Sequence, residues 1–446
     1  MPFLHGFRRI LFEYQPLVDA ILLTIGVEEG ASAQEEKFAY RRGAQPVDQD
    51  TVCSSLVDLL ERESKSSVFE EGISYALFKV AERGLVYAAE ILLRYGANLN
   101  FEDPVSYYSP LHVAVLKARP SMVRLLVGRS ADIEKRDRIH ESSPLDLASE
   151  ESDRLACMHA LLDLGANVNA KDKLGKSALV HALAYSDGLT VQNTENIELL
   201  LQRGADVHAA TQVGESAVSS LVFVIKQSLE ARNNEDAAQI GSYCVRVSEL
   251  LLAHGTDASR CLVEDGEPSL TQASLEHFDL LLPLAVLLLH RGAAFACSRH
   301  GAACWSGHTL LVKRLRSVLQ PHGGGTVDER RALEILEQAE FVLEAARLNH
   351  PSLPLPPGLE PPVPGDNPGT RGLFELHRRV VEQEASPPAL RCLCRAFLRR
   401  HLQPWPLDDK IQALPLPDRL KHFLLPENIQ SLKPSWKSFR PLHGTQ

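Results

Sequence analysis

A short apolar pattern recurs along the chain at nearly constant spacing, and it constrains the fold more than any other feature. Each copy has three aliphatic residues, two unconstrained residues and then two small residues, the first of which is usually Gly. Successive first small positions are 34, 35, 39, 51 and 37 residues apart. This period predicts a stack of similar helical units rather than one central core. The positions are Gly96, Ser130, Gly165, Gly204, Gly255 and Gly292.

A second signature has the same period and indicates where units begin. Ser109, Ser143 and Ser177 each start a run such as Ser-Pro-Leu-His-Val-Ala, in two steps of 34 residues. A Ser side chain caps a helix N-terminus, and Pro suits the first position because its φ is already helical. The Gly after each aliphatic triplet predicts the end of a second helix in a left-handed conformation. Ser130 replaces that Gly, so we expect a less regular helix end there.

Paired helices at a period near 33 resemble the ankyrin repeat. The resemblance implies a helix pair with a projecting finger in each unit. Two steps are long, and the extra residues centre on positions 186–190 and 226–236. Insertions in repeat arrays lie in loops on one face, which often binds partners. A tolerated surface loop is the other interpretation of both insertions.

Two ordered motifs stand near the C-terminus. Leu390, Cys394 and Leu398 recur every four residues, so on a helix they form an apolar ridge suited to a partner's groove. The sequence Leu414-Pro415-Leu416-Pro417 predicts a proline-braced turn at the start of another helix. A single ridge is usually core packing, but two motifs in this order resemble the SOCS box. That resemblance implies that the ridge binds the elongin B/C pair, and that Leu414, Pro415, Leu416 and Pro417 select a cullin.

An ankyrin array followed by this box resembles the ankyrin repeat and SOCS box family over nearly the whole chain. The resemblance implies an all-α fold, with an ankyrin-repeat solenoid, a proline-rich linker and a small helical SOCS box. It also implies a substrate-recognition subunit of a cullin-RING ubiquitin ligase, whose partners are elongin B/C and a cullin of the fifth type with its RING subunit. Bound targets would be ubiquitinated and degraded by the proteasome. The alternative is an ankyrin scaffold without ligase coupling.

The regions outside the repeats have their own composition. Residues 1–23 carry an apolar helical stripe that we expect to seal the first repeat. Residues 327–348 predict one long helix, residues 349–372 are rich in Pro and Gly and predict an extended linker, and 373–384 predict a short helix. We expect a capping segment at 1–66, six to seven repeats at 67–348, the linker at 349–372, the pre-box helix and box at 373–426, and a tail at 427–446.

Charge and composition exclude several function classes. The net charge of −10 is uneven, because residues 386–446 hold 10 basic and 4 acidic side chains and the remainder holds 37 and 53. An acidic body repels a phosphate backbone, so nucleic acid is not expected as a partner. Eight cysteines without regular close spacing fit a reducing compartment. No apolar run reaches the roughly eighteen residues of a membrane span, so we expect a cytoplasmic protein without a membrane partner.

One cysteine and histidine cluster suggests metal chemistry. Cys297, His300, Cys304 and His308 are spaced as a conceivable zinc quartet, but the repeat register places Cys297 in a finger, and Cys304 and His308 on or next to the following helix. We therefore expect small buried cysteines and no metal or cofactor. His112 and His181 stand on first helices, where we expect them to bond neighbouring turns. The sequence has no phosphate-binding glycine loop or nucleophile elbow, so we expect a non-catalytic chain.

The substrate surface is expected on the concave side of the array, on fingers and first helices between about residues 100 and 214. Large polar or aromatic residues at finger positions are the types enriched at binding hot spots. Solvated finger residues without a partner are the other interpretation, and the insertion at 226–236 is the alternative site. The finger residues that we select are Tyr107, Tyr108, Arg136, Arg138 and His140.

Overall fold

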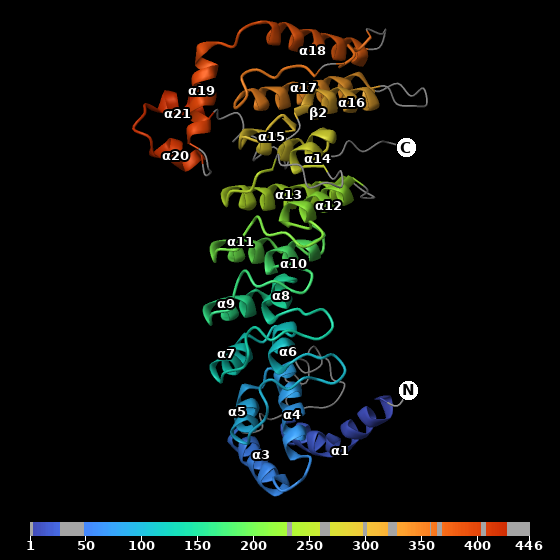
Figure 1. The fold of residues 1–446 in the computed structure, drawn as a ribbon, viewed down its shortest axis with the longest axis vertical. Coiled ribbons are helices and arrows are strands. Elements are labelled where there is room, and N and C mark those ends of the chain that lie inside the picture. The colour runs from blue at the N-terminus through green and yellow to red at the C-terminus, as the bar shows by residue number, and fades with distance from the viewer. Residues whose placement is uncertain are drawn as a thin grey trace. The chain divides into compact units, whose positions relative to one another are not determined.

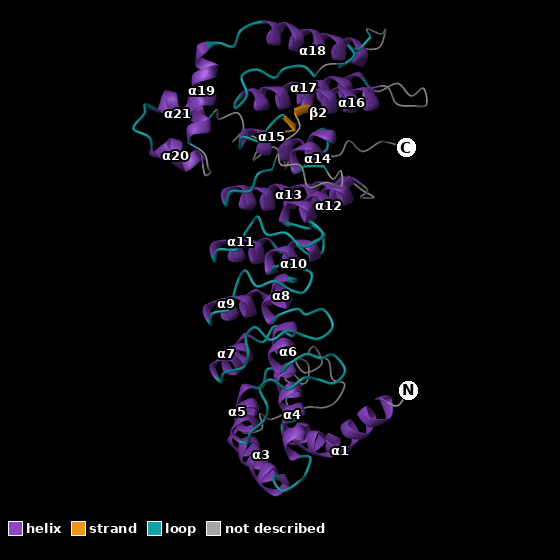
Figure 2. Ribbon diagram, in the orientation of Figure 1, coloured by secondary structure: helices purple, strands orange, loops and turns teal. Residues whose placement is uncertain are grey.

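The computed structural model describes residues 3–26, 49–229, 234–258, 268–297, 301–319, 328–356, 358–363, 368–402 and 407–425. The chain divides into two compact units. The first comprises residues 1–185 with 202–205, and the second comprises 186–201 with 206–446. Helices dominate both units, as the all-α prediction requires, and the described strands form one short hairpin in the second unit (Figure 2).

The first unit is built from successive helix pairs (Figure 1). The N-terminal helix packs against α4 and α3 and buries Tyr14, Leu17 and Ile21, three members of the predicted apolar stripe. The side chains of the other four, Phe3, Phe7, Ile10 and Leu11, lie outside the described residues. The helices are α1 Phe3–Thr24, α3 Gln49–Glu63, α4 Phe69–Arg83, α5 Val86–Arg94, α6 Pro110–Leu116, α7 Pro120–Gly128, α8 Pro144–Ser149, the 3-10 turn η1 Ser152–Arg154, α9 Leu155–Asp163 and α10 Ala178–Tyr185.

The first helices begin where the Ser-Pro signature predicts. The Ser109 side chain accepts a hydrogen bond from the His112 backbone N–H, and the His112 ring accepts one from the Ser109 N–H. Ser143 and Asp146 form the same reciprocal cap on α8. At each helix N-terminus, two backbone N–H groups without a partner inside the helix therefore bond a side chain of the cap. A serine cap followed by Pro explains why such short helices start at a fixed residue.

The expectation of a less regular end at Ser130 is wrong. Ser130 adopts a φ of 73°, in the same left-handed region as Gly165 with a φ of 97°. The hydrogen bonds are equivalent as well, because the Ala131 N–H donates to the Leu126 carbonyl as the Ala166 N–H donates to Leu161. Tertiary packing of the repeat imposes this turn on a residue that prefers to avoid it.

The second unit continues the helix pairs and ends in the C-terminal box. Its elements are α11 Thr194–Gln202, α12 Ala217–Leu229, α13 Asn234–Ala253, α14 Leu270–Glu276, α15 Leu282–His290, β1 Ala296–Cys297, β2 Gly301–Ser306, α16 Gly307–Leu319, α17 Glu329–Arg347, α18 Pro368–Ala385, α19 Leu390–His401, α20 Leu407–Ala413 and α21 Asp418–Leu424.

The two insertions have different structures. The residues around 186–190 form a loop, in which the Asp187 side chain accepts hydrogen bonds from the N–H groups of Leu189, Thr190 and Val191. The second insertion is not mainly a loop, because it lengthens the helices on both sides. Helix α12 has 13 residues and α13 has 20, whereas α6 has 7 and α7 has 9.

The proline-rich segment is extended, but it is packed along the helices instead of spanning open space. Leu353 is buried in the core of the second unit, and its carbonyl accepts a hydrogen bond from the His308 ring over 2.9 Å. The Leu353 N–H donates to the Glu384 carboxylate on α18 over 2.8 Å. Helix α18 begins at Pro368, earlier than the predicted Leu373, and packs against α17. Composition predicted the backbone conformation, while apolar residues between the prolines determine the docking.

Candidate docking surfaces

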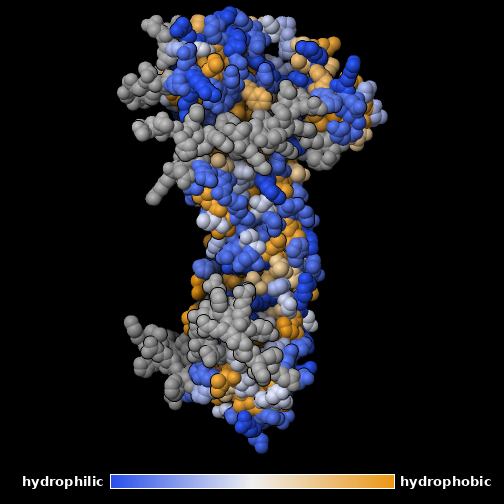
Figure 3. All heavy atoms as spheres, turned by 180° about the vertical axis from the view of Figure 1, so that it is seen from behind, coloured by the Kyte–Doolittle hydropathy of each residue, from blue (hydrophilic) through white to orange (hydrophobic). Residues whose placement is uncertain are grey.

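Helix α19 exposes one apolar face. The predicted ridge residues Leu390, Cys394 and Leu398 are all exposed, and Leu390 is 76% exposed. Leu393 and Phe397 are exposed beside them, which sequence reasoning missed although their spacing completes a helical stripe. We call these five residues the docking face. Apolar groups are visible on the surface of the box (Figure 3). An exposed stripe at positions i, i+3, i+4, i+7 and i+8 is the pattern of a helix that binds in a groove.

The other side of α19 is anchored within the second unit by a buried arginine. Arg399 is 0% exposed, and its Nε donates to Oδ1 of Asn349 over 2.7 Å. Its two Nη atoms donate to the backbone carbonyls of Leu424 and His290. Burial, together with the Arg399 charge, lowers the pKa of His290 to about 3, so this imidazole is neutral near pH 7. One guanidinium thus joins α19 to the ends of α15, α17 and α21.

The second motif forms the turn before α21, with Pro417 as the residue preceding the helix. Leu416 is half-buried against the small box core of Ile411, Leu424 and Leu425. Pro415 and Pro417 are exposed, and Leu414 is half-buried. The exposed prolines are therefore available to a partner, while Leu416 also holds the box together.

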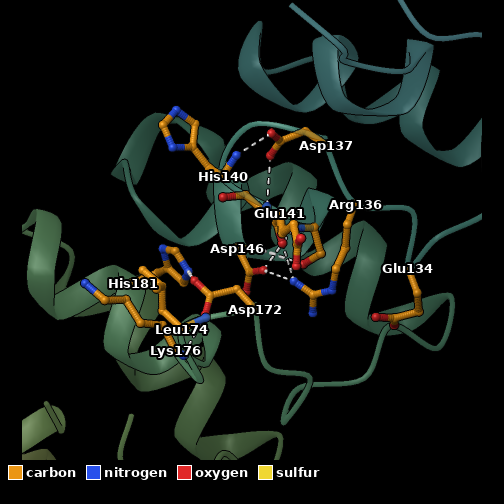
Figure 4. Close-up of polar contacts among 12 residues, drawn as sticks. Glu134, Arg136, Asp137, His140, Glu141, Asp146, Asp172, Leu174, Lys176 and His181 are labelled. Carbon is orange, nitrogen blue, oxygen red and sulfur yellow. Dashed lines mark hydrogen bonds and ion pairs between the residues drawn. The ribbon is translucent and has the colours of Figure 1, made fainter. Parts of the chain in front are cut away.

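The finger of residues 132–143 has a dense polar network (Figure 4). The Asp137 carboxylate accepts hydrogen bonds from the N–H groups of Ile139 and His140 over 2.7 and 2.8 Å. Arg136 donates to the Glu141 carbonyl and pairs with the buried Asp146 of α8 over 3.2 Å. The arginine therefore ties the finger to the first helix, and its charge is largely compensated.

The five predicted substrate residues divide into two groups. Tyr107, Arg138 and His140 are exposed, and the Arg138 guanidinium lies 5.8 Å from the centre of the Tyr107 ring. Tyr108 and Arg136 are half-buried and engaged internally, Tyr108 by stacking on the His112 ring at 5.7 Å. Burial raises the pKa of Tyr108, and the nearby Asp137 charge adds to that shift. The outward group is the better placed to contact a partner.

Comparison with known proteins agrees with this arrangement. The SOCS box family model matches residues 386–425, and the ankyrin repeat model matches residues 106–138 and 140–173. Human ankyrin repeat and SOCS box protein 6 is 49% identical over 433 residues, covering 97% of this chain and 99% of the relative. The chain belongs to the ankyrin repeat and SOCS box family. The mouse protein of the same name is 48% identical over 95% of this chain and 98% of its own length.

Similarity outside this family is partial. The mouse B-cell lymphoma 3 protein homolog is 30% identical over 211 residues, covering 47% of this chain. The resemblance to the ankyrin repeat and SOCS box family, predicted from the repeat and the two terminal motifs, is confirmed.

The conceivable zinc quartet is only partly described. Cys297 is buried on β1, and His308 lies on α16 with its ring bonded to the Leu353 carbonyl. Cys304 lies on β2, next to α16, and is exposed, so the expectation of a buried cysteine is wrong there. His300 lies outside the described residues. Within the described part of the chain, no group of three or more His, Cys, Asp or Glu side chains is arranged to hold a metal ion.

The two first-helix histidines bond neighbouring turns. His112 donates from Nε2 to the Ser142 carbonyl over 3.2 Å, and burial lowers its pKa to about 4. His181 donates to the Asp172 carboxylate of its own finger over 3.1 Å. Both rings therefore brace a finger against a helix.

No helix among the described residues is long and apolar enough to cross a membrane.

Proposed function

We propose that this chain is the substrate-recognition subunit of a cullin-RING ubiquitin ligase. The observation that carries the proposal is the exposed docking face of α19, within the segment that matches the SOCS box. The ankyrin array binds the target, and the box recruits the ligase. The chain adds no catalytic group of its own, and ubiquitination in the cytoplasm leads to proteasomal degradation of the target.

The box has two partners in this proposal. Leu390, Cys394 and Leu398 bind elongin B/C, assisted by Leu393 and Phe397. Leu414, Pro415, Leu416 and Pro417 bind a cullin of the fifth type, which carries the RING subunit. Leaving five apolar side chains in water is unfavourable, whereas a groove that desolvates them gains about 25 cal/mol for each Å² buried. Exposure of the whole stripe on an anchored helix therefore favours a partner.

The array supplies the target surface. We propose residues 67–348 as the array, 1–66 as its cap, and 368–426 as the pre-box helix and box, with the start of the pre-box helix moved to Pro368. Tyr107, Arg138 and His140 are accessible on their fingers, so they contact the target directly, while Tyr108 and Arg136 hold the surface in shape. The insertion at 226–236 is the alternative target site.

Co-purification tests the ligase assignment. The tagged chain should capture elongin B/C and a cullin of the fifth type. The double variant Leu390→Ser with Cys394→Asp should lose elongin B/C and retain its helical circular dichroism. A matched control is Leu333→Ser, because Leu333 is exposed on α17, outside the box. Capture of elongin B/C by the double variant at wild-type yield would refute the proposal.

A second function is an interaction scaffold, in which the box only caps the array. The buried Arg399 favours this alternative, because it bonds the box to the end of α15 and to Asn349. A wild-type chain that binds a target but recovers neither elongin B/C nor cullin would be such a scaffold.

A further inference from the structure

The tips of the fingers carry a second repeated feature, separate from the five residues discussed above. Each of these tips starts with an acidic residue, and the residue two positions later is aliphatic and exposed to solvent. Val105 is 69% exposed, Ile139 49% and Leu174 53%. In the second unit the corresponding tip again exposes an aliphatic residue, Val213. An isolated exposed aliphatic residue needs no explanation, but recurrence at one structural position does.

The backbone turn at each tip does not require these aliphatic side chains. The preceding acidic residue makes the turn by accepting tip N–H groups, as Asp172 does from Leu174 and Lys176 over 2.8 Å each. Asp103 bonds the Ser106 N–H over 2.7 Å, and Asp137 bonds its tip in the same way. A small polar residue at the exposed tip position would allow the same turn. The apolar side chains are therefore available for contact with another molecule.

Neighbouring tips are bonded to one another, so the three aliphatic residues form a fixed row. Lys173 donates from Nζ to the Ile139 carbonyl over 3.0 Å. Arg138 pairs with Glu102 over 2.6 Å, and Lys135 pairs with the same carboxylate over 2.8 Å. A row held in place before binding loses little conformational entropy when a partner adds to it.

The exposed charged side chains at the second and third tips have one sign. In the described stretches 137–141 and 171–176, the fully charged side chains classed as exposed are Arg138, Lys171 and Lys173. The carboxylates of Asp137 and Asp172 are buried under the tips, where they bond the backbone. The edge is thus apolar with the cations Lys171 and Lys173 beside it, while Arg138 pairs with Glu102, on a chain whose net charge is −10. Complementarity favours an acidic partner.

The distance between successive tips constrains the conformation of the bound partner. Packed helices lie about 8–10 Å apart, so successive tips advance by about that distance. A polyproline II segment rises about 3.1 Å per residue and has three residues per turn, so every third side chain lies on the same side and would meet a tip. We propose that Val105, Ile139 and Leu174 bind an extended acidic segment with an aliphatic side chain at about every third position. This inference rests on the proposed function only in taking that segment to belong to the ligase target.

The test uses the full chain and a phage-displayed library of random twelve-residue peptides. Recovered peptides should be rich in Asp and Glu and should carry aliphatic residues about three positions apart. The triple variant Val105→Ser, Ile139→Ser, Leu174→Ser should bind the recovered peptides about a hundredfold more weakly. The control Leu164→Ser removes an exposed leucine next to α9 in the same unit and should bind normally. The pair Arg138→Glu with Lys173→Glu should weaken binding, as should added salt.

Several outcomes would overturn the inference. These are recovery of basic peptides, recovery of none, or equal binding by the triple variant with unchanged circular dichroism. Binding of the chain to phosphatidylserine vesicles through the same three residues, in place of peptide binding, would assign the row to a membrane surface. Elongin B/C capture by the same preparations reports on the proposed function separately, because the tips and the box lie in different parts of the chain.

Discussion

Arg399 on α19 donates a hydrogen bond from Nε to Oδ1 of Asn349, 50 residues earlier in the chain, over 2.7 Å. Asn349 in turn donates from Nδ2 to the Leu289 carbonyl at the end of α15 over 2.6 Å. The docking helix is therefore fixed to the last helices of the array by a relay of buried polar groups. A buried guanidinium is stable only when its donors are satisfied, so the relay also enforces one position of the helix.

Replacement of Arg399 by Lys should loosen this anchor. An ammonium is a compact point charge and cannot reach three separate acceptors as a guanidinium does. Because hydrogen bonds to charged groups contribute about 1.5–3 kcal/mol each, we expect a loss of about 3 kcal/mol in local stability. Hydrogen exchange should then speed up in α19 and α21. Arg391→Lys, at an exposed position of the same helix, is the control, and equal protection in both variants would contradict the anchoring role.

Phe397→Ala tests the part of the docking face that the Leu and Cys ridge did not predict. Phe397 is 59% exposed on α19. Removing a central aromatic anchor commonly costs about 2 kcal/mol, or about thirtyfold in affinity. Titration of the chain with purified elongin B/C should show this loss without a change in helical content. If the affinity stays at the wild-type value, the groove does not extend over Phe397.

The fold was largely predictable because its signals are local. Ser109 and Ser143 cap their helices within three residues, and the left-handed Gly165 ends a helix within one turn. Packing of Leu353 was not predictable, because it depends on helices on either side of a proline-rich segment. The greater length of helices α12 and α13 was also not predictable, because the number of inserted residues in a repeat does not show whether they extend a helix or a loop.

The candidate site shows the same division. Leu390, Cys394 and Leu398 were predicted from their spacing, and their exposure on α19 agrees with a docking ridge. Nothing in the sequence distinguishes the buried Arg399 from the exposed Arg400 beside it, because that difference is made by contacts with residues 25, 50 and 109 positions away. The row of aliphatic tips does leave a sequence signal, which is an aliphatic residue two positions after the acidic residue in three consecutive fingers.

Pro415→Ala and Leu416→Ala should separate the two roles of the second motif. Pro415 is exposed, so its replacement should weaken cullin binding and leave elongin B/C capture intact. Leu416 contributes to the box core, so its truncation should destabilise the box by about 2 kcal/mol and weaken capture of both partners. Pull-downs with purified elongin B/C and cullin distinguish the two patterns. Identical behaviour of the two variants would mean that the motif acts as one unit.

Ser130→Gly should stabilise the first unit. A side chain at a φ of 73° costs about 1–2 kcal/mol, and part of this is offset by the greater unfolded-state entropy of Gly. We expect a net gain of about 0.5–1 kcal/mol in chemical denaturation. The reciprocal variant Gly165→Ser, at a φ of 97° with open space where a Cβ would lie, should lose a similar amount. A destabilised Ser130→Gly protein would mean that the serine hydroxyl matters more than the backbone.

His112 should make the stability of the first unit depend on pH. Burial lowers the pKa of His112 to about 4 from an ordinary value of 6.5, and its Nδ1 accepts the Ser109 N–H only when it is unprotonated. The unfolded chain therefore binds the extra proton more readily below pH 6.5. Stability is fully present above that pH and is lost as the pH falls towards 4, by at most about 3 kcal/mol.

Chemical denaturation between pH 7.5 and 4.5 should show this decline, and His112→Gln should make it shallower because Gln does not titrate. The exposed His140→Gln is the control, since His140 lies on the surface of its finger. A pH dependence unchanged by His112→Gln would assign the acid sensitivity to other groups. Because the His112 ring braces the finger of residues 132–143 through Ser142, acidification should also weaken target binding in parallel with the loss of stability.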